Sequence, residues 1–304
     1  MRTWKEGAWL KQVKEEWAKE NKQRERASRA ALVPGAKPQW FVNGQGQTMV
    51  VIPGPVEFVI GSPLTEAGRS DNETQHKKRI GRTFALAAKS VTVEQYRQFD
   101  KDYRLPAKYT RTADLPVVGT SWHQAAAYCN WLSKEEGIDE GQWCYEIEDG
   151  QVTKLKANYL GLTGYRLPTE AEMEYATRAG ALTSRYFGET EELLPKYAWY
   201  FKNSQERTWP VGSLKPNDLG LFDMQGNVYT WCQERYLSYP QGQGKKPEED
   251  KEDIYSINIQ HSRVLRGGSF LSQSSAVRSS YRYGSVPAYR YDSVGFRPAR
   301  TFTP

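Results

Sequence analysis

The sequence contains few cysteines and no long apolar run. Its 304 residues include three cysteines, Cys129, Cys144 and Cys232. Three scattered cysteines cannot build a disulfide framework or a Cys-x-x-Cys metal site, so a reducing, cytoplasmic setting is expected. A membrane span is not expected, because no run of about 18 apolar residues is present. The first residues also lack the apolar core of a secretory signal.

Net positive charge is scarce outside the first 37 residues. The net charge is +6, and residues 1–37 hold 10 Lys or Arg against 5 Asp or Glu, which leaves only +1 for residues 38–304. A nucleic-acid groove needs clustered Lys and Arg on the folded body. We therefore expect no nucleic acid on the main domain, and we divide the chain into a charged arm with a linker at 1–37 and a folded domain at 38–304.

The arm is predicted to be an amphipathic helix over residues 3–31. Leu10, Val13 and Trp17 recur at helical spacing, and Pro34-Gly35 ends the pattern. Because exposed tryptophan is costly without a partner, one interpretation is a docking arm for a partner protein. A solvated helix that packs back on the domain is the main alternative. A basic membrane-surface helix is a third, although acidic residues interrupt its charge.

Residues 271–293 contain no Lys and no Glu, but seven Ser and four Tyr. This composition is typical of binding loops, because Tyr gives a large contact area and Ser adapts its hydrogen bonds. Arginines recur around the segment like framework residues, at Arg266, Arg278, Arg282, Arg290 and Arg297. We predict a ligand face built by Leu271, Ser272, Ser274, Ala276, Tyr281, Tyr283, Ser285, Val286, Tyr289, Tyr291, Asp292 and Ser293. A polar strand and loop set without a binding role is the alternative.

The remaining patterns predict short strands and helices, and hence an α+β domain. Strands are expected at 49–52, 57–60 and 84–91, and polar loops at 62–79 and 241–253. Helices are expected after the capping residues Thr92, Ser121 and Thr169. The last of these opens a capping-box pattern, and its helix is expected to end at Gly180.

Several sequence blocks are specific to one family. They are IPG at 52–54, VTVEQY at 91–96, GYRLPTEAE at 164–172, NDLGLFDM at 217–224, GNV at 226–228 and RGGS at 266–269. On these blocks the chain resembles the formylglycine-generating enzyme (sulfatase-modifying factor) type of C-type lectin fold, from about Met49 to Arg300. The resemblance implies one compact domain with little regular secondary structure.

The resemblance also bears on catalysis. In the copper oxidases of the family, two cysteines five residues apart follow the RGGS block, bind copper and activate oxygen. The matching positions here are Ser272 and Val277, neither of which can supply a thiolate ligand. We therefore expect no catalytic residues and no copper chemistry.

Two other metal sites of the family are also affected. The iron-dependent sulfoxide synthases carry a histidine cluster. Here the histidines are His76, His123 and His261, which are not spaced as ligand pairs and are expected to be ordinary surface or supporting residues. Family members also hold structural calcium and commonly have a Glu where this chain has Thr230. That loss weakens one calcium site, because calcium prefers several hard oxygen ligands.

In character, the chain is closest to the variable proteins of diversity-generating retroelements. These proteins place mutated codons between the RGGS and GFR blocks. Adenine-targeted Asn codons can become Leu, Ser, Tyr, Asp, Val or Ala, but not Lys, Glu, Met or Trp. The composition of 271–293 fits this rule, provided that Gln273 lies outside the mutated codons.

The leading hypothesis is therefore a bacterial, non-catalytic recognition module with a protein ligand at its C-terminal face. This function follows from the face and not from the fold alone, because one scaffold serves many functions. A protein-modifying oxidase is one alternative, although it would need a metal site that the sequence does not show. A regulatory appendage of a larger signalling or conflict system is the other.

Overall fold

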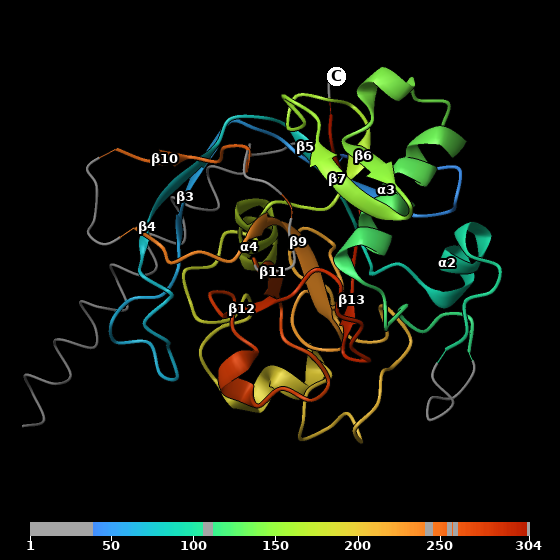
Figure 1. Ribbon diagram of the computed structural model, residues 1–304. Coiled ribbons are helices and arrows are strands. Elements are labelled where there is room, and N and C mark those ends of the chain that lie inside the picture. Colours follow the sequence, from blue (N-terminus) through green and yellow to red (C-terminus); the bar gives the residue numbers. More distant parts are fainter. Residues whose placement is uncertain (1–38, 106–111, 241–245, 254–256, 258–260, 303–304) are drawn as a thin grey trace, which may run out of the picture.

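The computed structural model describes residues 39–105, 112–240, 246–253, 257 and 261–302 (Figure 1). The arm predicted at 3–31 lies outside these residues. Within them, short helices and strands are joined by long irregular connections, which confirms the α+β class with little regular secondary structure. None of the described helices is long and apolar enough to cross a membrane.

The largest sheet has five strands, and all of its pairings are antiparallel. Across the sheet they are β1 (Gln39–Val42), β2 (Thr48–Ile52), β5 (Phe84–Ala87), β14 (Ala299–Thr301) and β8 (Tyr165–Arg166). The strand β14 follows the predicted ligand face in sequence and pairs with both β5 and β8. The C-terminal segment is therefore anchored in the middle of the domain.

Side chains of β2 alternate between two separate cores. Met49 and Val51 join the core that contains residues of helix α3 (Trp122–Glu135), whereas Val50 and Ile52 join the core that contains residues of helix α4 (Glu170–Arg178). Successive side chains of a strand point to opposite faces. Both faces of the sheet are therefore covered, which explains the uninterrupted apolar run of the predicted strand at 49–52.

Each of the three described α-helices begins with a capping box. Helix α2 (Val93–Phe99) is capped by Thr92, α3 by Ser121 and α4 by Thr169. In each case the side chain of the third helical residue accepts the backbone N–H of the capping residue. These predictions are confirmed. Helix α4 ends at Arg178, and Ala179 takes a left-handed conformation with φ 47° just before the predicted end at Gly180.

The start of α4 is held by a buried ion pair. Glu172 accepts the N–H of Thr169 at 2.9 Å and two hydrogen bonds from Arg166, both at 2.7 Å. Burial by itself would raise the Glu172 pKa, but the Arg166 and Arg82 guanidiniums outweigh it and hold this pKa well below the usual range. The GYRLPTEAE block therefore has a structural role, since it joins β8 to α4.

Of the two smaller sheets, the three-stranded one corrects the loop predictions. One contains β3 (Val56–Ile60), β4 (His76–Ile80) and β10 (Glu248–Glu249), and the other is the hairpin of β6 (Tyr145–Glu148) and β7 (Gln151–Leu155). The loops predicted at 62–79 and 241–253 are wrong where β4 and β10 form. In β4 only His76 and Ile80 are buried, opposite Ile60 and Val56. The charged residues between them hide the strand pattern.

The fourth sheet carries the predicted ligand face. Across it lie β12 (Arg282–Ser285), β11 (Arg263–Arg266), β9 (Tyr229–Arg235) and β13 (Val294–Gly295). Only β13 runs parallel to its neighbour, and the other pairings are antiparallel. Three short 3₁₀ helices complete the described elements, at Glu140–Gln142, Glu191–Lys196 and Ser274–Ala276.

Candidate binding face

The buried Arg266 holds the backbone of the predicted face. It lies at the end of β11 and donates hydrogen bonds to the carbonyl oxygens of Ser279, Ser280 and Tyr281 at 2.8 to 2.9 Å. Its guanidinium also pairs with the buried carboxylate of Glu174 on α4. Three consecutive carbonyl groups are thereby fixed to one side chain, so this stretch cannot move independently of the core.

Two further arginines tie the segment to distant parts of the chain. Arg278 pairs with the carboxylates of Glu66 and Glu73. Arg282 forms two hydrogen bonds with Glu170, at 2.6 and 2.7 Å. Such bidentate, charge-assisted pairs set orientation as well as energy. The prediction that these arginines form a framework is confirmed.

Arg297 and Arg290 occupy opposite environments. Arg297 is fully buried and donates to the carbonyl oxygens of Ala87 and Phe222, at 3.1 and 2.9 Å. Burial lowers the Arg297 pKa to about 10. Arg290, in contrast, is exposed. Its prediction as a framework residue is wrong, because it lies in the loop 286–293 that leaves the sheet between β12 and β13.

The predicted ligand residues differ in exposure. The four most exposed have 44 to 52% of their surface accessible, and they are Leu271, Tyr283, Tyr289 and Tyr291. The partly exposed ones are Ser274, Ala276, Tyr281, Val286, Asp292 and Ser293. Contrary to the prediction, Ser272 and Ser285 are buried. The Ser272 hydroxyl accepts the N–H of Ser269 at 2.9 Å, and Ser285 lies at the end of the edge strand β12, paired with Arg263.

Tyr289 and Tyr291 lie in the loop 286–293, which backbone hydrogen bonds hold in place. The N–H of Trp122 donates to the carbonyl oxygen of Pro287 at 2.9 Å, and the N–H of Gly119 donates to that of Tyr291 at 3.0 Å. The two tyrosine rings meet edge to face, with centroids 5.7 Å apart. The loop therefore presents an ordered aromatic pair to solvent.

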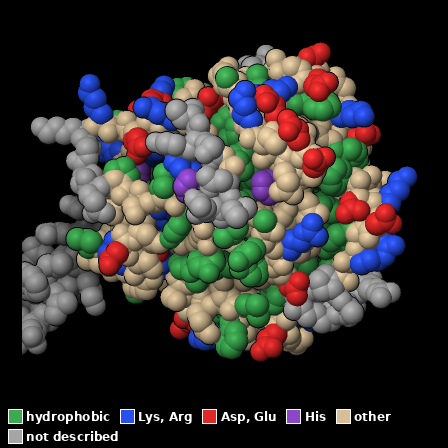
Figure 2. Space-filling view, in the orientation of Figure 1, with side chains coloured by type: hydrophobic (Ala, Val, Ile, Leu, Met, Phe, Trp, Pro, Cys, Tyr) green, Lys and Arg blue, Asp and Glu red, His purple; other side chains and the backbone are tan. Residues whose placement is uncertain are grey.

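Tyr283 adds a third exposed ring from β12. Its ring centroid lies 6.0 Å from that of Tyr229 on β9. Tyr229 is in turn next to the end of the 286–293 loop, since its N–H donates to the carbonyl oxygen of Ser293 at 2.9 Å. Figure 2 shows hydrophobic side chains gathered over the region of β12 and β13. Tyr229 thus links the ring on β12 to the loop that carries the other two.

Phe201 extends the face, and the sequence analysis missed it. It is 45% exposed, and its N–H donates to the carbonyl oxygen of Ser272, the residue after Leu271, at 3.0 Å. The available signal was the run of three aromatic residues at 199–201. Of these three residues, Tyr200 is buried and Phe201 is exposed.

The positions of the family's catalytic cysteines hold no thiol. Ser272 is buried in its turn, and Val277 packs in a core cluster with Leu194 and Tyr200. The three cysteines are free and buried elsewhere. Burial raises the pKa of all three thiols, that of Cys144 to about 12. Copper ligation by thiolates therefore does not fit these residues.

The other candidate ligands do not form a metal site either. Among the described residues, no group of three or more His, Cys, Asp or Glu side chains could hold a metal ion. His123 is buried. This burial, together with the nearby charge of Arg263, lowers the His123 pKa to about 4, so the imidazole is neutral near pH 7. At the calcium block, the Asn227 side chain is paired with the backbone of Trp209, and Thr230 is buried. This block does not fit calcium.

Comparison with known proteins agrees with the fold and the blocks. The family model of the sulfatase-modifying factor enzyme 1-like domain matches residues 36–302. The inactive C-alpha-formylglycine-generating enzyme 2 of Bos taurus is 27% identical over 298 residues, which cover 86% of this chain and 91% of that protein. The structure of Treponema denticola variable protein 1 superposes with a TM-score of 0.70 and 25% identity, covering 88% of this chain and all of that one.

A further relative is much longer than this chain. The serine/threonine-protein kinase pkn1 of Chlamydia pneumoniae is 32% identical over 190 residues. The match covers 62% of this chain but only 24% of the kinase. The chain thus spans about a quarter of the length of that relative.

Proposed function

Since the chain belongs to the family of sulfatase-modifying factor enzyme 1-like domains, we propose that it uses this scaffold as a non-catalytic module that recognises a protein ligand. The observation that carries the proposal is the difference in solvent exposure between the tyrosine and the arginine side chains of residues 266–293. Tyr283, Tyr289 and Tyr291 are about half exposed, whereas the framework residues Arg266 and Arg278 are 1% exposed. A rigid base with projecting aromatic side chains is how binding surfaces limit the entropy lost on association.

The proposed ligand face has aromatic and apolar anchors surrounded by a rim of partly exposed residues. Leu271, Tyr283, Tyr289 and Tyr291 are the anchors, and Phe201 adds one from outside the segment. The rim consists of Ser274, Ala276, Tyr281, Val286, Asp292 and Ser293. Exposed aromatic side chains of this kind are enriched among the residues that dominate binding energy in protein interfaces. The buried Ser272 and Ser285 take no part.

Diversification of the face by a retroelement is part of the proposal. The variable residues would be the exposed ones of 271–293, and the invariant ones would be the buried Arg278 and Arg282 between them. The likeness to Treponema denticola variable protein 1 supports this division. The proposal also keeps the arm at 1–37 as a docking element for a protein partner and the reducing cytoplasm as the location, the latter supported by three free cysteines.

Alanine variants of Tyr283, Tyr289 and Tyr291 test the binding face. Each is expected to change the free energy of unfolding by no more than about 0.5 kcal/mol, because the side chain is exposed. Affinity for a partner recovered by pull-down is expected to fall by about 1 to 4 kcal/mol for each ring that is a hot spot. Thermal unfolding and calorimetric titration measure the two quantities.

The matched control is Trp40→Ala. Trp40 is an exposed aromatic residue at 62%, but it lies on β1 in a different sheet. Its replacement should leave affinity unchanged. If the tyrosine variants unfold the protein, or if Trp40→Ala weakens binding equally, the segment is not the recognition surface.

Incubation with a sulfatase-type peptide tests the absence of catalysis. Copper-loaded protein, oxygen and a cysteine-containing peptide are expected to yield no formylglycine, because Ser272 and Val277 supply no thiolate. Mass spectrometry of the peptide cysteine measures the conversion, and peptide with copper alone is the control. Conversion above that control would show that the domain is an enzyme.

A regulatory role within a signalling protein is the second candidate. It is favoured by the match to the pkn1 kinase, because the matched region makes up only 24% of the length of that protein. In that arrangement the same aromatic face would contact another part of the assembly.

A further inference from the structure

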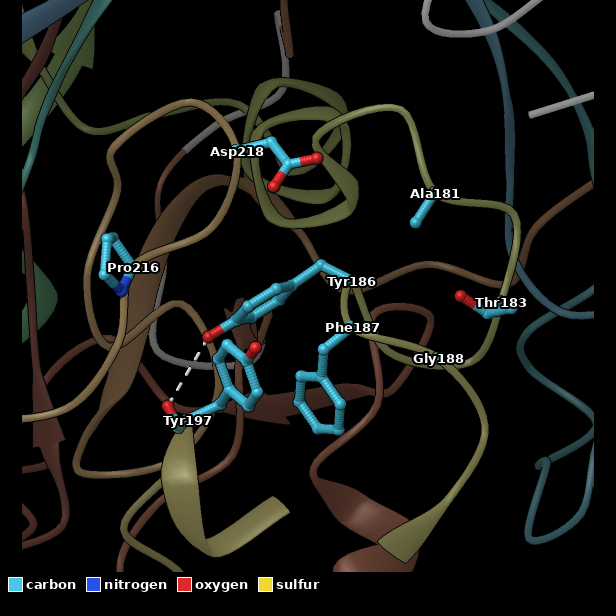
Figure 3. A pocket seen from close by; sticks show the side chains of 8 residues that line it. All are labelled: Ala181, Thr183, Tyr186, Phe187, Gly188, Tyr197, Pro216 and Asp218. Carbon is cyan, nitrogen blue, oxygen red and sulfur yellow. Dashed lines mark hydrogen bonds between the residues drawn. The ribbon is translucent and has the colours of Figure 1, made fainter. Parts of the chain in front are cut away.

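The small cavity behind the loop 181–188 has its polar groups already engaged (Figure 3). Its volume is about 240 Å³, and Asp218 on its wall already has an interaction partner. The Thr183 hydroxyl donates to the carbonyl oxygen of Arg185 at 2.6 Å, and the Lys215 ammonium lies 5.9 Å from the centroid of the Tyr197 ring. The hydrogen-bonding groups that remain open lie instead on β1, at the edge of the largest sheet.

The strand β1 turns the backbone N–H and C=O groups of Trp40 and Val42 away from its neighbour β2. The N–H of Asn43 donates to the carbonyl oxygen of Gln47 at 3.0 Å, so residues 43 and 47 form a hydrogen-bonded pair. Hydrogen-bonded and non-hydrogen-bonded pairs alternate along an antiparallel ladder. Because the register of β1 and β2 continues from this pair, residues 39 and 41 face β2, and residues 40 and 42 face outward. Thr48, which lies opposite Val42, accordingly uses its carbonyl oxygen to accept the N–H of Ala88, at 2.8 Å.

The outer edge of β1 is open among the described residues. No described strand lies beyond it. The side chains of Trp40 and Val42 are 62 and 55% exposed, and they lie on one face of the strand. Phe41 between them lies on the opposite face, where its ring stacks on that of Phe302 with centroids 5.9 Å apart. An edge with outward backbone groups and exposed apolar side chains is a template for pairing with another chain.

This edge is complementary to itself. If a second copy pairs antiparallel about a twofold axis at Phe41, Trp40 of each copy lies opposite Val42 of the other copy. These are the two residues whose backbone groups face outward, so each Trp40–Val42 pair exchanges its N–H···O=C hydrogen bonds in both directions. The same register sets an exposed aromatic side chain beside an exposed β-branched one, which is a favourable cross-strand pair. Pro38 has no N–H and ends the pairing on its side.

Charge complementarity favours a second copy as the occupant of the edge. In this register residue 38 of one copy lies opposite Gly44 of the other. The segment 1–37, which joins β1 at that point, holds 10 Lys or Arg against 5 Asp or Glu. The N–H of Gly44 is bonded to the Glu136 side chain, and residues 134–140 at the end of α3 contain four acidic side chains and one Lys. The basic arm of one copy therefore leaves β1 beside the acidic end of α3 in the other.

We propose that β1 is the contact of a homodimer, in which two copies join their largest sheets edge to edge through Trp40 and Val42. The pairing is independent of the proposed ligand face, because β1 and β12 belong to different sheets. The contribution of the arm rests on its proposed docking role, and the second copy is the partner that it contacts.

Sedimentation equilibrium of the full chain, without any ligand, tests the dimer. A dissociation constant of about 1 to 100 µM is expected, because the contact is small. Raising the salt concentration from about 0.05 to about 0.5 M should weaken the dimer several-fold, because salt screens the charges of the arm. A chain that stays monomeric at roughly 500 µM would overturn the proposal. An affinity that does not change with salt would overturn the contribution of the arm.

Two substitutions at exposed positions test the register. Val42→Lys and Trp40→Glu each set a charge against an apolar side chain of the other copy, so each variant alone is expected to dimerise at least about tenfold more weakly. In a mixture of the two variants, the introduced carboxylate and ammonium lie opposite each other, and the second pair remains Trp40 with Val42. The mixed dimer should be at least about threefold tighter than either variant with itself. Native mass spectrometry separates the three dimers by mass, and equal affinities would overturn the register.

Leu64→Lys is the matched control. Leu64 is 86% exposed in the connection between β3 and β4, outside the largest sheet. The variant adds the same charge as Val42→Lys at an exposed apolar position and should leave the dimer unchanged. An equal loss in Leu64→Lys would show that added charge alone weakens association, and it would overturn the assignment to β1. The concentration and salt series use the unaltered protein, so they hold even if a variant folds poorly.

Discussion

Replacement of Arg266 by alanine is expected to lower the free energy of unfolding by about 3 to 5 kcal/mol. The substitution leaves the buried Glu174 carboxylate without its Arg266 partner and removes the hydrogen bonds to three consecutive carbonyl groups, those of Ser279, Ser280 and Tyr281. Glu174 keeps its ion pair with Arg178, so the cost lies mainly in the three carbonyl groups, each of which costs about 1 to 3 kcal/mol when it is left buried without a donor. Because those carbonyls lie in the segment 271–293 that carries the proposed face, ligand affinity should fall together with stability. Chemical denaturation measures the change.

Arg290→Ala is the matched control for Arg266→Ala. Arg290 has the same chemistry and lies in the same C-terminal segment, but it is exposed. Its replacement should change the free energy of unfolding by no more than about 0.5 kcal/mol. Equal effects of the two variants would show that the buried arginine does not set the position of the segment.

Gly226→Ala is expected to cost about 2 to 5 kcal/mol of folding free energy. Gly226 has φ +78°, and an added Cβ would lie 2.4 Å from the carbonyl oxygen of Trp199. This oxygen cannot easily retreat, because it accepts the N–H of Asn227 at 2.7 Å. The N–H of Gly226 is itself bound to the carbonyl oxygen of Gly267, at 2.8 Å, so the strain would reach the RGGS block.

Gly220→Ala separates the two causes of this cost. Gly220 has nearly the same φ, +77°, but no atom lies within 4 Å of an added Cβ. Only the left-handed backbone cost of about 1 to 2 kcal/mol should remain. Urea denaturation of both variants gives the difference. A Gly226→Ala variant as stable as Gly220→Ala would mean that the loop of Trp199 shifts without cost.

Local chemistry made several elements predictable from the sequence. The helices after Thr92, Ser121 and Thr169 begin where expected, because a capping box closes its hydrogen bonds within four residues. The strand at 49–52 was also found, since its apolar run must be buried somewhere. Neither prediction requires knowledge of which distant residues pack against these elements.

Segments whose polar groups find distant partners were not predictable. The Asp250 carboxylate accepts from Thr169 at 2.8 Å and from Arg82 at 2.5 Å, which draws a segment expected to be a surface loop into the domain. In His76–Ile80 the charged side chains conceal a strand with only two buried positions. In both cases the stabilising contact lies far away in sequence.

The sequence by itself determined the family blocks, the lack of thiols at Ser272 and Val277 and the aromatic, serine-rich composition of 271–293. Only the tertiary structure decided which side chains of that segment reach the surface. In the structure Ser272 is buried and Arg290 is exposed. Phe201 is hydrogen-bonded to Ser272, the residue after Leu271. The physical reason is that composition is a property of each residue, whereas exposure depends on hydrogen bonds and packing between residues that are distant in sequence.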